Sequence, residues 1–181
     1  DGLGRLIQNV SVKVTPSGKD VVVPVEYDAY GRKLKSYLPI PQPASSNGAI
    51  YTNPLANVSA TYGAEKIYSE NIPEASPLGR PLSQKQVGNA WNTKPINFSY
   101  ASNVLNEVKK YTVTTSWAEG RTINTLSLSG TYPANTLYKS TVTDEDGNVT
   151  IAFKNKKGQT VLLRKKEDSK DVDTYYIYNK Y

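Results

Sequence analysis

The sequence contains no cysteine and no histidine, and each absence removes a class of chemistry. Without cysteine there is no disulfide framework, no thiolate nucleophile and no thiolate-bound zinc or iron–sulfur site. Without histidine there is no Ser-His-Asp triad and no imidazole metal site. Catalysis is left with carboxylate pairs, Ser-Lys arrangements, tyrosine and carboxylate-bound calcium or magnesium.

Methionine is absent as well, and the sequence begins at Asp1. Because translation starts with methionine, we expect this chain to be a processed or excised piece of a longer protein. Its 181 residues are the length of one ordinary domain. We therefore predict that residues 1–181 form a single domain fragment of a larger protein.

Long apolar runs and a strong charge excess are also missing. No apolar stretch reaches the roughly 18 residues that a membrane-spanning helix needs, so we expect no membrane insertion. The net charge is +6, and the basic residues are spread along the chain. Nucleic-acid binding is one interpretation of this charge. A solvated basic surface is the favoured interpretation, and we expect no nucleic-acid partner.

Tyrosine is what the sequence has in quantity, with 14 residues against two Trp and two Phe. The hydrophobic fraction is only 38% with Tyr included, which is low for a globular domain. Tyrosine must therefore supply much of the bulk of the core, as it does in many β-sheets.

Residues 1–40 are predicted to form β-hairpins. The run from Gln8 to Val14 alternates polar and apolar residues, which is typical of a half-buried strand. A second strand is predicted over residues 21–27, where Pro24 indicates an edge position or a bulge. A third predicted strand follows over residues 32–38.

Residues 41–98 hold most of the prolines, and neither helix nor strand periodicity is strong there. We predict a long irregular excursion rich in Pro and Tyr. One or two helical turns are possible between Ala56 and Tyr68, interrupted by Gly63. Excursions of this length are uncommon unless they are functional or packed against a scaffold.

Residues 99–181 return to β character and are predicted to be hairpins. Strands are predicted over residues 111–117, 122–129, 136–142, 148–154, 159–164 and 173–178. Asp146-Gly147 between two such runs favours a type I′ turn, which needs positive φ at both central residues. Because the connections are short, the sheets must be antiparallel. The fold class is therefore mainly β, with antiparallel sheets of consecutive hairpins and little helix.

An internal pattern recurs at the predicted turns. Its form begins with two aromatic residues separated by one residue, followed directly by Asp or Asn. Two further residues, Gly and a polar residue come next, and an apolar strand follows. The acidic or amide side chain caps its own turn, and glycine takes a φ that other residues disfavour. The residues that carry the pattern are Asp1, Gly4, Arg5, Tyr27, Asp28, Gly31, Arg32, Asp146, Gly147 and Gly158. Residues 176–181 look like a copy that stops just before its glycine.

The segment Glu26–Arg32, with the sequence EYDAYGR, strongly resembles the tyrosine–aspartate (YD) repeat of Rhs proteins. An ordered series of further segments resembles the uncharacterised domain that precedes the YD repeats in Rhs proteins of Bacteroides-type bacteria. Gly79 departs from that domain, which usually has Asn there. The segments are Asp1–Arg5, Tyr68–Glu70, Glu74–Arg80, Gly88–Trp91, Tyr132–Lys139 and Thr143–Asn148.

The resemblance implies a structural role in place of a reaction. Rhs proteins are large, exported or surface-associated chains whose YD repeats form a spiralling β-sheet shell, and many are polymorphic toxins with a variable toxin enclosed at the C-terminus. By resemblance, this chain is a non-enzymatic shell segment of a secreted or cell-surface bacterial protein. Its partners are then the adjacent YD repeats of the parent chain, and no cofactor is implied.

Several functional interpretations remain open beside structural ones. Asp144–Asn148 superficially resembles a calcium loop, but its glycine is fourth where the calcium pattern requires sixth, so a hairpin turn is favoured. Glu26 and Asp28 lie on one strand face and are a conceivable catalytic pair. A turn cap beside a solvated glutamate is favoured there.

A carbohydrate-binding module of a cell-surface protein is the alternative function. Trp91 and Trp117 are the candidates for stacking on sugars, with glycans as the partner, although core or cross-strand packing is the favoured role of each. The basic run from Lys154 to Lys166 is a candidate contact for an acidic partner, a polyanion or a neighbouring shell segment. A solvated hairpin rim or a charged edge strand is the favoured interpretation of that run.

Overall fold

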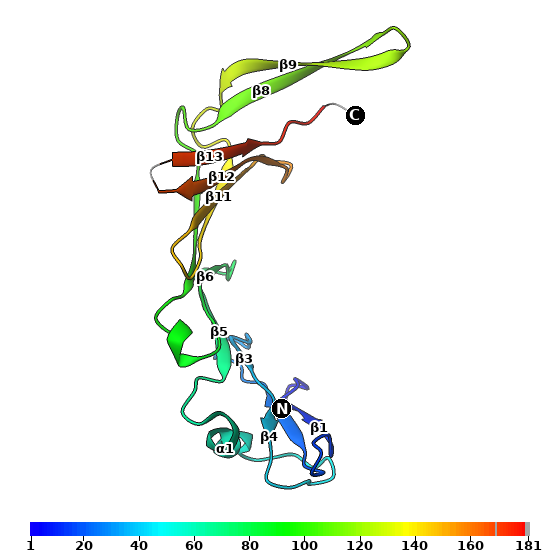
Figure 1. The fold of residues 1–181 in the computed structure, drawn as a ribbon, viewed down its shortest axis with the longest axis vertical. Helices are drawn as coiled ribbons and strands as arrows, with labels where there is room; N and C mark the ends of the chain where they lie inside the picture. The colour runs from blue at the N-terminus through cyan, green and yellow to red at the C-terminus, as the bar shows by residue number, and fades with distance from the viewer. Residues whose placement is uncertain (169, 180–181) are drawn as a thin grey trace. The chain divides into compact units, whose positions relative to one another are not determined.

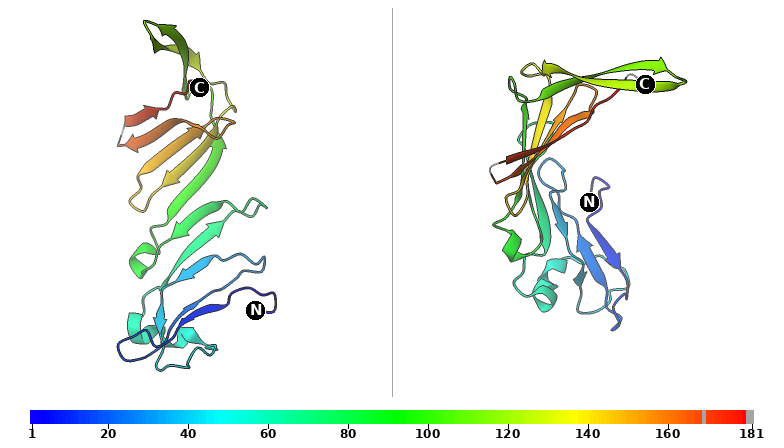
Figure 2. Two further views of the ribbon diagram at one scale, coloured as in Figure 1. Left: turned by 90° about the vertical axis from the view of Figure 1, so that its right-hand side faces the viewer. Right: turned by 45° about the horizontal axis from the view of Figure 1, so that its top comes forward.

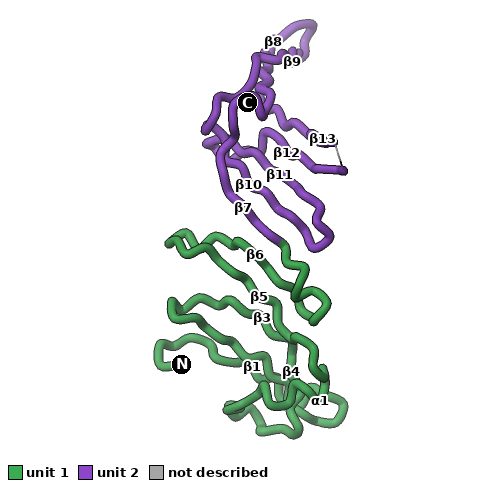
Figure 3. Tube along the Cα trace, turned by 90° about the vertical axis from the view of Figure 1, so that its left-hand side faces the viewer, with its two compact units in different colours: residues 1–96 green, residues 97–181 purple. Residues whose placement is uncertain are grey.

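A computed structural model describes residues 1–168 and 170–179 of the chain (Figure 1). The structure is mainly β, and its sheets are built from antiparallel hairpins with little helix, which confirms the predicted fold class. The chain divides into two compact units, Asp1–Ile96 and Asn97–Tyr181, coloured separately in Figure 3.

The first unit contains two small antiparallel sheets. One sheet has the order β1-β2-β4, and the other has the order β3-β5-β6. The strands are β1 (Gln8–Ser11), β2 (Val21–Pro24), β3 (Lys35–Tyr37), β4 (Ile40–Pro41), β5 (Tyr68–Pro73) and β6 (Pro81–Lys85).

Strand β1 is shorter than its alternating sequence predicts. It ends at Ser11 because Lys13 adopts φ 52 and donates its backbone N–H to the carboxylate of Asp20 (2.8 Å). Pro24 is the last residue of β2 and pairs with Gln8 on one side. On the other side β4 reaches only Val21 and Val22, so the proline removes no ladder hydrogen bond there.

The proline-rich segment 41–98 contains more regular structure than its sequence indicates. A 3-10 turn η1 (Pro54–Asn57) leads into α1 (Val58–Tyr62), which ends at Gly63, as predicted. The hairpin β5–β6 was not predicted. Its prolines Pro73 and Pro81 face each other at the end of the ladder, where a missing N–H costs little. A second 3-10 turn is η2 (Asn89–Trp91).

The second unit has one sheet and one separate hairpin. Its five sheet strands lie side by side in the antiparallel order β7-β10-β11-β12-β13, and β8 pairs with β9 (Figures 1 and 2). Each strand predicted from residue 111 onward has a counterpart, although the last one spans Lys170–Tyr175 where residues 173–178 were predicted. The elements are β7 (Ile96–Ser102), β8 (Lys109–Ala118), β9 (Arg121–Thr131), β10 (Tyr138–Thr143), β11 (Val149–Lys154), β12 (Thr160–Glu167) and β13 (Lys170–Tyr175).

The β8–β9 hairpin has two chemically different faces. Its register opposes Tyr111 to Leu128 and Val113 to Leu126 on the face that also carries Trp117. Because side chains alternate along a strand, the other face is dominated by serine and threonine. That face includes Thr112, Thr114, Ser116, Thr125 and Ser127.

One buried cluster forms the core of the second unit. It joins the strand residues Ile151 and Phe153 of β11 to residues of β12 and of the loops near the β8–β9 hairpin. Tyrosines complete it: Tyr175 packs against the cluster and meets Tyr111 edge-on, with ring centroids 5.1 Å apart. The buried members are Val108, Leu137, Ile151, Phe153, Val161 and Leu162.

A buried asparagine ties the loops of the second unit together. The carbonyl oxygen of the Asn103 side chain accepts backbone N–H groups from Thr136 (2.9 Å) and Leu137 (2.8 Å). Its amide group donates to the carbonyl of Pro133 (2.8 Å). Asn103 is fully buried, so its amide replaces water as the partner of these backbone groups.

Among residues 1–168 and 170–179, no helix is both long and apolar enough to span a membrane.

Candidate functional site

Four turns of the chain share one geometry. In each, the carbonyl of the first residue accepts the N–H of a glycine three positions later, at 2.9 to 3.1 Å. A side-chain oxygen of the first residue accepts the N–H groups of the third and fifth residues, at 2.8 to 3.0 Å. The four first residues are Asp1, Asp28, Asp144 and Asn155.

The side chain of the fifth residue completes each turn. Arg5 and Arg32 bind the second carboxylate oxygen of Asp1 and Asp28, with Nε–O distances of 2.7 and 2.8 Å. In the third turn the amide of Asn148 donates to Asp144 (2.9 Å). The fourth turn begins with an amide, and the direction reverses.

In that fourth turn the side-chain amide of Asn155 donates to the amide oxygen of Gln159 (2.9 Å). The sequence pattern recorded the fifth position only as polar. In the sequence, the first and fifth positions of each turn match: Asp at the first occurs with Arg or Asn at the fifth, and Asn occurs with Gln. The predicted pattern did not include this match.

The backbone of these turns corrects the predicted type I′ turn at Asp146-Gly147. Gly147 has φ 88, but Asp146 is not among the residues with positive φ. A three-residue loop, residues 145–147, that ends in a single glycine with positive φ is the type I turn with a G1 bulge. A turn with positive φ at both central residues does occur in the β8–β9 hairpin, at Glu119 (φ 53) and Gly120 (φ 74).

The capping residue of the third turn is Asp144, and the assignment of Asp146 to the motif is corrected accordingly. Asp146 lies two residues later and donates its N–H to Asp144. Both carboxylate oxygens of Asp144 take donors from within the turn. The arrangement is a hairpin cap, and within the described parts of the chain no cluster of three or more acidic side chains is placed to hold a metal ion.

Two further turns use the same backbone with a hydroxyl in place of the carboxylate. In the first, Gly18 donates to the carbonyl of Thr15 (2.9 Å), and Lys19 donates to the Thr15 hydroxyl (2.8 Å). In the second, Gly79 donates to the carbonyl of Ser76 (3.1 Å).

The Ser76 turn is wider, and a glutamate supplies its negative charge. Leu78 donates its N–H to the Ser76 hydroxyl (3.2 Å), which itself donates to Glu74. Arg80 binds both carboxylate oxygens of Glu74, at 2.9 and 2.8 Å. Arg80, at the fifth position of the turn, thus still binds a carboxylate, although Ser76, the first residue, does not carry one.

The turn hydrogen bonds lower the pKa values of the capping carboxyls. The backbone N–H and then the guanidinium of Arg32 hold the pKa of Asp28 below its usual value. The side-chain amide of Asn148 lowers the pKa of Asp144. The hydrogen bonds from Arg80 lower the pKa of Glu74 from 4.5 to about 2. All three groups therefore remain charged at neutral pH.

Glu26 and Asp28, the conceivable catalytic pair, have separate partners. Glu26 pairs with Lys35 (3.2 Å), whereas Asp28 is engaged with Arg32 and the turn backbone. The two carboxylates therefore do not share a proton. Asp28 caps its turn, and Glu26 forms a partly exposed ion pair beside it.

Consecutive turns are linked by the aromatic half of the pattern. Tyr27 precedes the Asp28 turn and donates its hydroxyl to the carbonyl of Leu6, just after the Asp1 turn (3.0 Å). Tyr178 donates in the same way to Thr160, just after the Asn155 turn (2.9 Å). Each tyrosine therefore holds the segment that leads into one turn against the residue that directly follows the preceding turn.

Backbone register repeats with the same offset. Val25 donates its N–H to the carbonyl of Ile7, and Tyr176 donates to Val161. Asn179 therefore has the same position with respect to the Asn155 turn that Asp28 has with respect to the Asp1 turn. The predicted truncated copy is described as far as Asn179, and its last residues, Lys180 and Tyr181, lie outside the described residues.

Strand β13 is an edge of its sheet. It pairs with β12 on one side, and none of the described residues forms a strand on the other. Arg164 of β12 holds Asp173 with two hydrogen bonds of 2.7 and 2.8 Å and lies 3.3 Å from Asp171. Arg164, a member of the basic run, therefore has its partners within the sheet, and the hydrogen bonds that it donates to Asp173 raise its pKa.

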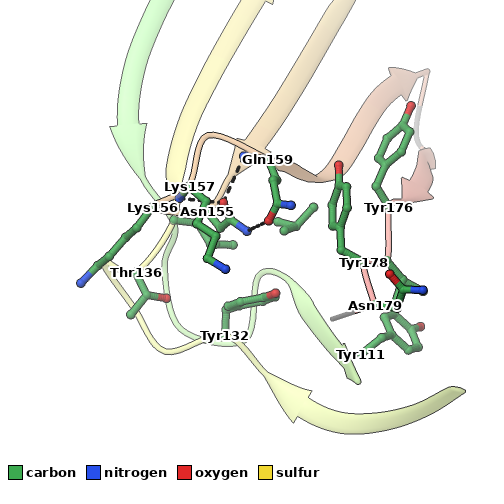
Figure 4. A pocket seen from close by; sticks show the side chains of 13 residues that line it. Tyr111, Tyr132, Thr136, Asn155, Lys156, Lys157, Gln159, Tyr176, Tyr178 and Asn179 are labelled. Carbon is green, nitrogen blue, oxygen red and sulfur yellow. Dashed lines mark hydrogen bonds between the residues drawn. The ribbon is translucent and has the colours of Figure 1, made fainter. Parts of the chain in front are cut away.

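A cleft in the second unit gathers tyrosines from three separate parts of the chain (Figure 4). Tyr111 comes from β8, Tyr132 follows β9, and Tyr176 and Tyr178 follow β13. The cleft has a volume of about 510 Å³. Lys156 and Lys157 of the Asn155 turn also line it. Part of the basic run thus lies beside aromatic side chains, a juxtaposition that the sequence did not reveal.

The two tryptophans proposed as sugar-stacking residues are not in this cleft. Trp91 lies on η2 of the first unit and is 42% exposed, and Trp117 lies on β8 of the second unit and is 72% exposed. Trp117 lines a separate depression with Thr115, Thr122 and Asn179.

Comparison with known proteins places the chain in a family. No curated protein and no solved structure matches it. A family model described as "Domain of unknown function (DUF6443)" matches residues 1–104, which is more than half of the chain and covers the first unit together with β7. The chain belongs to the DUF6443 family.

Proposed function

We propose that the chain is a non-enzymatic structural segment of a secreted or cell-surface Rhs/YD-repeat protein. In this role it extends a β-sheet shell by pairing strands with adjacent repeats of the same parent chain. The proposal rests on the resemblance of Glu26–Arg32 to the YD repeat and on the turn geometry that this segment adopts.

The observation that carries the proposal is the recurrence of one capped turn with one register. The Asp28 turn follows the Asp1 turn with the same tyrosine and backbone hydrogen bonds that lead from the Asn155 turn to Asn179. A unit that reproduces its own starting position is able to propagate, which is the property of repeat architectures.

The exposed edge of β13 supports the same role. Its backbone groups on the outer side are available to a further antiparallel strand, and sheet extension satisfies such groups. Asp171 and Asp173 on this strand both pair with Arg164, whose single charge offsets one of the two carboxylates. A neighbouring strand therefore meets less charge repulsion than two unpaired carboxylates would cause.

The experiment extends the chain with its own repeat. Residues 156–167 follow Asn155 as turn and strand β12, so a copy of them is appended after Asn179 in place of Lys180 and Tyr181. Hydrogen exchange is then followed at the β13 amides. We expect slower exchange at residues 170–175 and a higher Tm, because the added strand pairs with the open edge.

The matched control carries the same appended residues with the copied Gly158 replaced by proline. Proline cannot adopt the positive φ of 79 that Gly158 has in its own turn. The control should leave β13 exchange as it is in the unextended chain. Equal exchange in the extended, control and unextended chains would count against sheet extension.

A further inference from the structure

We propose that the outer edge of β9 in the second unit is a dimerisation surface, on which β9 of a second copy of this chain pairs antiparallel. The two hairpins then form one four-stranded sheet in the order β8-β9-β9-β8. This edge is not the β13 edge used for sheet extension. The inference therefore goes beyond the proposed function and does not depend on it.

Strand β9 is long and exposed. With 11 residues, Arg121–Thr131, it is the longest strand that the structure describes, and every residue in it except Ile123 is exposed. It pairs with β8 on one side, and within residues 1–168 and 170–179 no strand pairs with its other side (Figure 1). A long exposed edge of this kind is a template for another strand.

The two-residue turn at Glu119 and Gly120 decides which backbone groups of β9 point outward. A turn of this kind is closed by a hydrogen-bonded pair, here Ala118 and Arg121, and bonded pairs then alternate with non-bonded pairs along the hairpin. Residues of the non-bonded pairs direct their N–H and C=O groups away from the hairpin. On β9 these residues are Thr122, Asn124, Leu126 and Leu128.

Strand β9 lacks the features that normally protect an edge. Charged residues and prolines on an edge strand discourage pairing with other chains, and neither occurs between Thr122 and Thr131. Strand β8, the other edge of the hairpin, begins with the exposed lysines Lys109 and Lys110. The β9 edge is therefore the one that accepts a further strand.

The charge and symmetry of this edge favour a second copy of the same strand. Two identical charged edges would place like charges side by side, whereas residues 122–131 bring no charge to the interface. An antiparallel pair of identical strands also has two-fold symmetry. One self-complementary edge therefore satisfies both copies, and the assembly closes as a dimer.

One alignment of the two copies matches their side chains best. With the two-fold axis at Ser127, Leu126 of each copy lies opposite Leu128 of the other. These leucines are 54% and 58% exposed in the single chain, and apolar pairs across strands stabilise a sheet. An axis at Leu126 would place Leu128 opposite Asn124 and leave one leucine pair in place of two.

Sedimentation equilibrium of the intact chain tests the association. We expect a monomer–dimer equilibrium. Asn124→Pro removes an outward N–H while leaving the hydrogen bonds to β8 in place. It should weaken dimerisation about tenfold or more, because the symmetry of the dimer removes two donors at once.

Thr115→Pro is the matched control. Thr115 lies directly opposite Asn124, on the outer edge of β8, and the two side chains share one hydrogen bond of 2.7 Å. Both proline variants therefore lose the same contact within the hairpin, but Asn124→Pro alone blocks the β9 edge. Thr115→Pro should dimerise as the unmodified chain does.

Disulfide formation tests the position of the two-fold axis. The chain contains no cysteine, so Ser127→Cys introduces a single thiol. In the proposed dimer residue 127 faces itself in a non-bonded pair, with Cα atoms about 4.5 Å apart, a distance that a disulfide spans. Mild oxidation should therefore link two copies of this variant covalently.

Thr112→Cys is the control for the crosslink. Thr112 of β8 lies opposite Ser127, and their hydroxyl oxygens are 3.0 Å apart, so either substitution removes the same contact. In the dimer the two copies of residue 112 are separated by three strand spacings, about 14 Å, which no disulfide bridges. Oxidation of this variant should give no linked dimer on a non-reducing gel.

Three results would overturn the proposal. One is a chain that stays monomeric up to millimolar concentration, which would assign the β9 edge to a different partner. Another is equal weakening of dimerisation by Asn124→Pro and Thr115→Pro. The third is equal crosslinking of the Ser127→Cys and Thr112→Cys chains, whether both link or neither does. The cysteine variants alter only side chains, so their result remains interpretable even if a proline disturbs the hairpin.

Discussion

A methyl group on Gly31 would stand 2.9 Å from the guanidinium nitrogen Nη1 of Arg5. The same guanidinium binds Asp1 and lies 4.4 Å from the ring centroid of Tyr27. The arginine that completes one turn therefore packs directly on the glycine of the next. Gly31 is required there for two separate reasons, its positive φ of 77 and the space that Arg5 occupies.

Three alanine substitutions separate these two reasons. Gly2 has ordinary φ and open space, Gly4 has φ 74 and open space, and Gly31 has positive φ together with the Arg5 contact. We expect Gly2→Ala to be neutral and Gly4→Ala to destabilise by about 1 kcal/mol. Gly31→Ala should cost more, within about 1–3 kcal/mol. Urea unfolding measures all three, and equal losses for Gly4 and Gly31 would show that the contact with Arg5 is unimportant.

Asp144 and Asp146 provide a test of which aspartate caps its turn. Asp144→Ala removes the oxygens that accept from Asp146 and Asn148, whereas Asp146→Ala removes a side chain outside this network. We expect the first substitution to lower Tm by about 2–4 °C and the second to change it little. Differential scanning calorimetry at neutral pH gives both values, and the reverse order would reinstate Asp146 as the cap.

The fold class and most strands of the second unit followed from alternation and turn residues. Glycine turns at Gly120, Gly147 and Gly158 join β8 to β9, β10 to β11 and β11 to β12, so the local turn signals and the tertiary structure agree there. The repeat itself was also visible, because Asp28 and Gly31 recur at one spacing with equivalents elsewhere in the chain.

Long-range features were not readable in this way. β5 and β6 lack clear alternation, and their prolines discouraged a strand prediction, yet Pro73 and Pro81 occupy the end of the ladder where no N–H is required. The tyrosine cleft joins β8, the Asn155 turn and the end of β13. The order of strands in the sheet brings the Asn155 turn close to the end of β13, and β8 joins them from a separate hairpin. A linear pattern specifies neither arrangement.

Acid should weaken the Glu74–Arg80 contact. The pKa of Glu74 is lowered from 4.5 to about 2 in the folded chain, so its stabilisation is complete above about pH 4.5 and is lost as the pH falls toward 2. Glu74→Gln should lower Tm by about 2–4 °C at pH 7, and the difference from the unmodified chain should vanish near pH 2.

Glu167→Gln, which changes an exposed carboxylate of β12, is the control for that pH series. Its Tm should track the unmodified chain at every pH. A Glu74→Gln difference that stays constant from pH 7 to pH 2 would show that the glutamate stabilises the loop through packing and that its charge is unimportant.

Replacing Asn103 should be the most damaging single polar substitution in the second unit. Asn103→Ala leaves the N–H groups of Thr136 and Leu137 and the carbonyl of Pro133 without their buried partner. We expect a loss of about 2–4 kcal/mol in the free energy of unfolding. Asn71→Ala, at an exposed position of β5, should change it by less than about 0.5 kcal/mol. Similar losses for the two would contradict the buried role.

The positive φ values of Glu119 and Gly120 have a consequence for the integrity of the β8–β9 hairpin. A shift of one residue in strand pairing would exchange the face with Leu126 and Leu128 for the face with Ser127. The two-residue turn determines where the chain reverses and therefore selects one of these alignments. The turn thereby disfavours misregistered pairings of this exposed hairpin, one face of which is apolar, and such pairings would favour aggregation.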